Sequence, residues 1–265
     1  MFRIVSLVPS ITELLFELGL GPQVVGRTAW CIHPRAARSV PKVGGTKDVQ
    51  LERVRELAPT HVIVNVDENR RETYDALREF VPHVVVTHPL APRDNLELYR
   101  QMGAVFDCEI EAERLCGEFE RAWTELGEGP RGRDTSVLLL IWQQPWMTVS
   151  RDTYVSRMLA TIGWQTLPLE ASARYPVIDR SAWWLEEVEL VLLASEPFPF
   201  RRSHLAAAAA LAPGRPVKLI DGEMISWYGS RAIRGLAYLG AQREAWAEQQ
   251  RSTRGLTAGV APGKI

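Results

Sequence analysis

The chain has 265 residues, 46% of them hydrophobic, which is enough apolar material for one large domain or two lobes of roughly 120 residues each. Its 31 Lys and Arg residues balance 32 Asp and Glu residues, and this near-zero net charge argues against nucleic acid or an anionic membrane as the main partner. No apolar run approaches the length of about 20 residues that spans a bilayer.

The first elements of the chain are a predicted strand and a predicted helix. Residues 4–8 are apolar enough for a buried parallel strand. Ser10 and Glu13 have the S-x-x-E spacing of a capping box, which predicts a helix that opens at Ser10. Gly19 is expected to close this helix, because glycine tolerates the left-handed conformation that ends many helices.

Helices and strands alternate along the rest of the first half. Helical spacing of apolar residues predicts helices over 51–57 and about 70–80, and apolar β-branched runs predict strands over 61–65 and 83–86. Such alternation is typical of a parallel sheet with helices on its faces.

The second half begins after a long predicted helix and repeats the pattern. Apolar residues at helical spacing indicate a helix over about 109–126, and the glycine-rich segment 127–132 breaks it. A strand over 137–142 starts the alternation again, and the segment 185–195 resembles the segment 51–65. We therefore predict an α/β fold of two Rossmann-like lobes with parallel sheets, joined by a single long helix, with a ligand cleft between the lobes.

The predicted boundaries follow from these elements. The N-terminal lobe covers 1–108, the connecting helix and boundary cover 109–130, the C-terminal lobe covers 131–249, and a flexible tail covers 250–265.

Aromatic residues in loops after strands are the first candidates for ligand contacts. Ligands of open α/β sheets lie outside the carboxyl ends of the strands, and Trp142 and Trp146 follow the first strand of the second lobe. Tyr175 falls in another expected cleft loop. Trp227 either flanks the cleft or packs at the start of the final helix.

The sequence carries no catalytic signature. It has no phosphate-binding loop, no nucleophile elbow and no zinc-protease motif, and the acidic pair Asp67 and Glu68 lacks a nucleophile or metal ligands beside it. Cys31 and His33 alone are too few for a protein metal site. We expect neither enzymatic activity, nor a covalently bound cofactor, nor a metal site built by the protein.

Several segments in order are similar to one protein family. They are Val43-Gly44-Gly45-Thr46-Lys47, the following 51–54 and 58–64, the opening 4–13, the loop Trp30-Cys31-Ile32-His33-Pro34, and the late segments 220–223 and 227–231. Together they resemble the vitamin B12 and iron-chelate binding proteins of ABC importers, which are helical-backbone periplasmic binding proteins. The similarity runs over about 245 residues, to near Gln249.

This resemblance implies a corrinoid such as cobalamin, or another metal chelate or tetrapyrrole, as the ligand. Trp30 stands where cobalamin binders of the family carry a cleft aromatic, and Glu223 aligns with an acidic cleft position. Asn65 departs from the pattern, since an aromatic residue is expected there, and makes this side of the cleft more polar. His33 is the first candidate for an axial ligand to a chelated metal.

The resemblance also implies a membrane partner. Family members dock on an ABC permease through one acidic residue on each lobe, and Glu72 and Glu196 are the counterparts here. A monomer is expected. No leader precedes the first strand, so the chain as given is expected in the cytoplasm, and in the periplasm if a leader has been removed.

Two other functions remain open at this point. One is a cytoplasmic corrinoid-binding relative without a permease, which the missing leader favours. The other is a two-lobed α/β transferase, such as a sugar-nucleotide transferase. That enzyme requires a phosphate-cradling loop or a catalytic carboxylate pair, which the sequence does not display.

Overall fold

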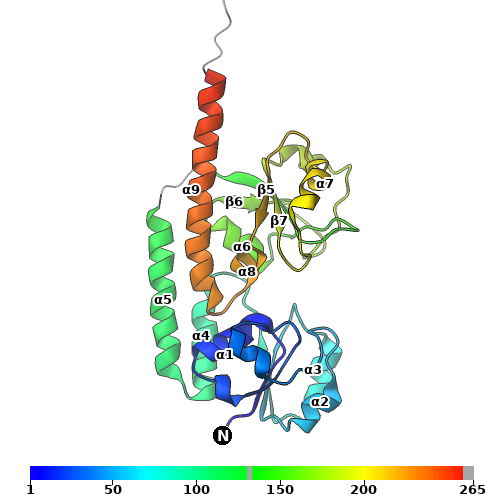
Figure 1. Ribbon diagram of the computed structural model, residues 1–265, viewed down its shortest axis with the longest axis vertical. Helices are drawn as coiled ribbons and strands as arrows, with labels where there is room; N and C mark the ends of the chain where they lie inside the picture. Colours follow the sequence, from blue (N-terminus) through cyan, green and yellow to red (C-terminus); the bar gives the residue numbers. More distant parts are fainter. Residues whose placement is uncertain (130–132, 259–265) are drawn as a thin grey trace, which may run out of the picture. The chain divides into compact units, whose positions relative to one another are not determined.

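The structure is a computed structural model that describes residues 1–129 and 133–258, with side chains up to residue 252. The chain forms two compact units (Figure 1). Unit 1 consists of Met1–Glu120 and Trp227–Ile233, and unit 2 of the described residues within 121–226 and 234–265. The predicted α/β class is confirmed in both units, because each contains a parallel four-stranded sheet flanked by helices.

The sheet of unit 1 has the strand order β2-β1-β3-β4. Its strands and helices are β1 (Ile4–Ser6), α1 (Pro9–Glu17), β2 (Val24–Arg27), α2 (Leu51–Glu56), β3 (His61–Asn65), α3 (Arg71–Leu77), β4 (His83–Thr87) and α4 (Asp94–Phe106). Two short 3-10 helices cover Gly21–Gln23 and Arg35–Ser39. In Figure 1 the helices α2 and α3 cover one face of this sheet. Valine side chains of β1 and β3 pack with Val54 of α2 and Leu77 of α3 in one core cluster, as expected for strands with a buried face.

The start of α1 differs from the sequence-based expectation. The helix begins at Pro9 with Val8 as its N-cap, and no side chain caps it, so the predicted capping box of Ser10 and Glu13 is wrong. Proline suits the first helical position because it has no backbone N–H to leave unpaired there. Glu13 instead pairs with Arg231, more than 200 residues away in the sequence. The closing glycine is confirmed, since Gly19 has a φ of 78°.

The sheet of unit 2 repeats this order as β6-β5-β7-β8. Its elements are β5 (Thr135–Leu140), α6 (Tyr154–Ala160), β6 (Trp164–Thr166), β7 (Leu190–Ala194), α7 (Leu205–Ala209), β8 (Val217–Ile220) and α8 (Gly222–Ser226), with 3-10 helices over Trp183–Glu187 and Arg202–His204. The two sheets match strand for strand, in agreement with the internal repeat in the sequence.

Two long helices contribute residues to both units. They are α5 (Glu109–Glu128), which is the long helix expected from the sequence, and α9 (Arg231–Ala258). The segment 250–265 was expected as a tail, but α9 continues through it to Ala258, and residues 259–265 lie outside the described residues. Within residues 1–129 and 133–258, none of the helices combines the length and hydropathy needed to cross a membrane.

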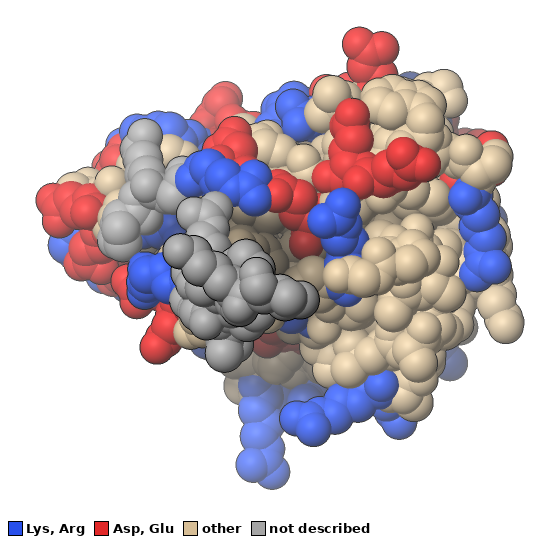
Figure 2. Space-filling model, turned by 90° about the horizontal axis from the view of Figure 1, so that it is seen from above, with Lys and Arg blue, Asp and Glu red and all other residues tan. Residues whose placement is uncertain are grey.

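Both Lys and Arg side chains and Asp and Glu side chains are present on the face shown in Figure 2, with a broad area of other residues between them. Neither sign of charge dominates this face, in keeping with the net charge of −1.

Candidate functional site

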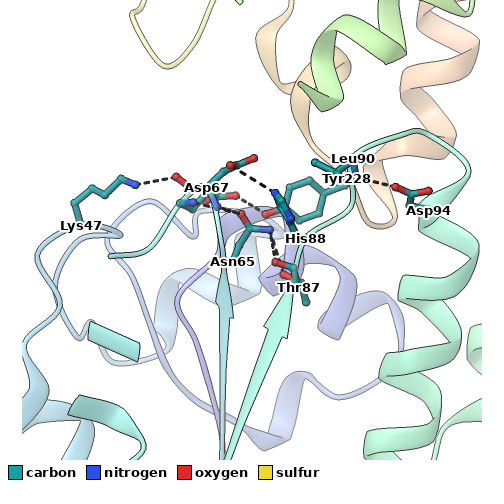
Figure 3. Close-up of polar contacts among 9 residues, drawn as sticks. Lys47, Asn65, Asp67, Thr87, His88, Leu90, Asp94 and Tyr228 are labelled. Carbon is teal, nitrogen blue, oxygen red and sulfur yellow. Dashed lines mark hydrogen bonds and ion pairs between the residues drawn. The ribbon is translucent and has the colours of Figure 1, made fainter. Parts of the chain in front are cut away.

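The carboxyl ends of β3 and β4 in unit 1 carry a cluster of polar side chains. Figure 3 shows Lys47, Asn65, Asp67, Thr87, His88 and Tyr228 gathered there. Asn65 and Thr87 are paired in register as the last residues of their strands, so parallel pairing places both at the same edge of the sheet.

Asn65 shapes the loop that follows β3. Its side-chain oxygen accepts hydrogen bonds from the backbone N–H groups of Asp67 (2.8 Å) and Glu68 (3.3 Å). Its side-chain amide donates to the carbonyl oxygen of Thr87 at 2.9 Å. The side chain is only 3% exposed. The structure therefore shows Asn65 as an organiser of the loop, and its direct contact with a ligand stays a prediction.

Asn69, which the sequence reasoning missed, ties three loops together. Its side-chain oxygen accepts from the backbone N–H of Asn65 at 2.8 Å, and its amide donates to the carbonyl oxygens of Leu7 (3.3 Å) and Thr46 (2.9 Å). Two asparagines four residues apart at the end of a predicted strand are the sequence signal that was available. Together they fix the loops after β1 and β3 and the loop that carries Lys47.

The acidic pair Asp67 and Glu68 after Asn65 is held by specific contacts. The hydroxyl of Tyr228, from the segment between α8 and α9, donates to a carboxylate oxygen of Glu68 at 2.6 Å. Asp67 lies 3.7 Å from the imidazole Nε2 of His88, and its carbonyl oxygen accepts from Lys47 at 2.8 Å. Neither Glu68 nor Tyr228 was singled out as a site residue from the sequence.

Burial shifts the proton affinity of this pair. It raises the pKa of Glu68 from its ordinary 4.5 to about 7, while the Tyr228 hydroxyl and the Lys47 ammonium pull that pKa downward and Asp67 pushes it upward. Burial also raises the pKa of Tyr228 well above its ordinary value. Glu68 therefore changes charge near neutral pH.

The aromatic candidates of unit 1 differ in exposure. Trp30, in the turn after β2, is 66% exposed. Trp227 is buried, with the guanidinium carbon of Arg231 4.6 Å from its ring centroid and the ring of the half-buried His33 5.7 Å away, edge to face. Trp227 therefore packs against His33 and Arg231, and its contact with a ligand stays a prediction.

The carboxyl edge of unit 2 carries an aromatic cluster. Trp142 packs edge to face on Phe198 (5.6 Å between centroids), and Trp146 stacks on Phe200 (6.0 Å). Sequence reasoning named the tryptophans but missed the phenylalanines, which follow β7 in a Pro-Phe-Pro-Phe run. Trp142 is 41% exposed, so part of its ring faces solvent.

The remaining predicted residues lie around these two edges. Tyr175 is 40% exposed, on a segment whose backbone bonds to residues 146–150. Glu223 is half-buried in the first turn of α8. Of the two docking candidates, Glu72 is exposed in the first turn of α3, whereas Glu196 is half-buried and accepts a hydrogen bond from Ser226 at 3.4 Å.

Residues 4–196 match the sequence pattern of the periplasmic binding protein family, which is a family of binding proteins. A vitamin B12-binding protein from Pectobacterium carotovorum is 23% identical over 74% of this chain and 72% of its own length. An uncharacterized ABC transporter substrate-binding lipoprotein from Bacillus subtilis, YvrC, is 27% identical over 68% of this chain and 57% of its own length.

The fold is similar to that of solved binding proteins. The periplasmic heme-binding protein RhuT from Roseiflexus sp. RS-1 superposes with a TM-score of 0.75 at 22% identity, covering 91% of this chain and 97% of that one. Neither the transferase nor the binding protein without a permease gains support from these similarities.

Proposed function

Because the chain belongs to the periplasmic binding protein family, we propose that it binds a corrinoid, or haem or another metal chelate, as the substrate-binding component of an ABC importer. Three exposed aromatic side chains beyond the strands, Trp30, Trp142 and Tyr175, carry the proposal. Aromatic rings suit the broad apolar faces of a tetrapyrrole, because they offer large contact area at low conformational cost.

Other residues join these three as proposed ligand contacts. They are His33, Asn65, Trp146, Glu223 and Trp227, with His33 as the proposed axial ligand to the chelated metal. The vitamin B12-binding and heme-binding relatives support the ligand class, and the substrate-binding lipoprotein supports the transport role. The metal belongs to the ligand in this proposal, so the protein itself needs no metal site or covalent cofactor.

A fluorescence titration tests the ligand class and the contacts together. Cyanocobalamin, cobinamide and haemin are each titrated while tryptophan emission is followed, and at least one is expected to quench it with saturation. Trp30→Ala and Trp142→Ala are each expected to weaken binding by about tenfold or more, as for central aromatic contacts.

Trp183 provides the matched control. It is 70% exposed and lies in the 3-10 helix that precedes β7, whereas the proposed contacts Trp142 and Trp146 follow the end of β5. Trp183→Ala should leave the affinity unchanged. Absence of saturable quenching by all three compounds would contradict the proposed ligand class.

Glu72 and Glu196 are the proposed contacts with basic residues of the permease. Long-range charge pairing mainly accelerates and orients docking. The double variant Glu72→Gln, Glu196→Gln is therefore expected to slow ligand uptake severalfold in cells that hold the protein and its permease, with the affinity for free ligand unchanged. Glu52→Gln, on the exposed side of α2, is the control. Full uptake by the double variant would rule these contacts out.

A further inference from the structure

Unit 2 contains a cavity of about 310 Å³ at the amino edge of its sheet, away from the aromatic cluster. Trp123 and Leu126 of α5 and Ile162 after α6 form apolar parts of its wall. Asp134, just before β5, and Arg243 of α9 are the charged residues that line it. Its volume falls at the lower end of the range of about 300–1,000 Å³ that is typical of small-molecule sites.

Arg243 is buried beside this cavity without an ion pair among the described residues. The residue is 7% exposed, and its Nη2 donates to the carbonyl oxygen of Leu126 at 3.0 Å. Its Nε is buried and has no acceptor among the residues that the structure describes. Within that part of the chain no carboxylate forms an ion pair with this guanidinium, although Asp134 lines the same cavity. A buried charge is strongly unfavourable unless a counter-charge and hydrogen bonds accompany it.

We propose that the cavity binds a small organic monocarboxylate. The carboxylate group accepts hydrogen bonds from the Arg243 guanidinium and supplies the missing counter-charge. The apolar body of the ligand lies against Trp123, Leu126 and Ile162.

Asp134 limits the ligand to a single negative charge. Its carboxylate is exposed and accepts a hydrogen bond from the side chain of Gln165 at 3.1 Å. The wall also includes residues 160–163 at the end of α6, where the helix dipole places partial negative charge. A second anionic group on the ligand would be repelled by both.

Calorimetric titration with four probes tests this proposal. Hexanoate is expected to bind, while the neutral hexanamide and the dianionic adipate bind at least about tenfold more weakly, since each loses or opposes the charge pairing. Equal affinity for hexanoate and hexanamide would refute the role of Arg243. Inorganic phosphate binding as tightly as hexanoate would refute an organic ligand, and no binding by hexanoate would overturn the proposal.

Three variants distinguish a loss of binding at this cavity from a loss of binding caused by misfolding. Arg243→Gln removes the cation and is expected to weaken hexanoate binding at least about tenfold. Ala160→Phe leaves Arg243 in place but fills part of the cavity, so it should also block binding. Arg251→Gln, an exposed arginine on the same helix, should bind hexanoate like the parent protein. Circular dichroism confirms that each variant is folded, and undiminished binding by folded Arg243→Gln or Ala160→Phe would place the ligand elsewhere.

Discussion

Replacing Glu13 with alanine is expected to lower the free energy of unfolding by about 3–5 kcal/mol, because it leaves a buried guanidinium without its partner. The carboxylate of Glu13, on α1, accepts two hydrogen bonds from Arg231, at 2.7 Å from Nε and 2.9 Å from Nη2. The side chains are only 5% and 6% exposed. Urea denaturation measures the change as a lower midpoint.

A double variant distinguishes an unpaired charge from lost packing. Glu13→Leu with Arg231→Met removes both charges at similar volume and should recover most of the stability lost by Glu13→Ala. Asp75→Ala breaks the exposed pair of Arg71 and Asp75 on α3 and should have almost no effect, since surface ion pairs contribute little. A Glu13→Ala protein as stable as the parent would show that water reaches Arg231.

Glu68→Gln is expected to remove a pH dependence of stability that the parent protein shows between about pH 4.5 and 7. Below pH 4.5 the carboxyl is protonated in the folded and the unfolded chain, so it favours neither. As the pH rises toward 7, the unfolded chain releases this proton while the folded chain, with its pKa of about 7, retains it. The free energy of unfolding therefore falls over this window, by about 3 kcal/mol in total for this group, and levels off above pH 7.

The comparison is made as the difference between variant and parent at each pH, because other groups titrate in the same range. Glu72→Gln is the matched control, as this exposed carboxylate four residues away should not alter the profile. Tyr228→Phe removes the hydrogen bond that lowers the pKa of Glu68, so the loss of stability should extend to higher pH and become larger in total. A Glu68→Gln profile parallel to that of the parent would mean that the Glu68 carboxyl titrates at its ordinary pKa.

Under the proposed function, the same titration also affects ligand binding. Asp67 and Glu68 follow the carboxyl end of β3, the kind of edge at which ligands of open α/β sheets lie. A site whose charge changes near pH 7 would give a pH-dependent affinity for a charged chelate, which the fluorescence titration can record at pH 6 and pH 8.

Local patterns in the sequence predicted most of the secondary structure. The strand over 61–65 and the starts of the helices at 51 and 109 coincide with β3, α2 and α5, because apolar periodicity and glycine or proline boundaries act over a few residues. The helix α4 was missed. The internal repeat also predicted twin sheets, and the order of the strands in each sheet agrees with it.

Sequence by itself thus determined the fold class, the family and the loops that follow each strand, since these depend on short-range spacing and on segments in a fixed order. Only the tertiary structure decided what the polar residues do. Glu13 pairs with Arg231 across 218 positions, Tyr228 reaches Glu68 across 160, and Arg243 lines a cavity with Asp134. The free energy of a buried charge or hydrogen bond depends on partners that the fold brings from distant segments. Short-range patterns in the sequence do not identify those partners.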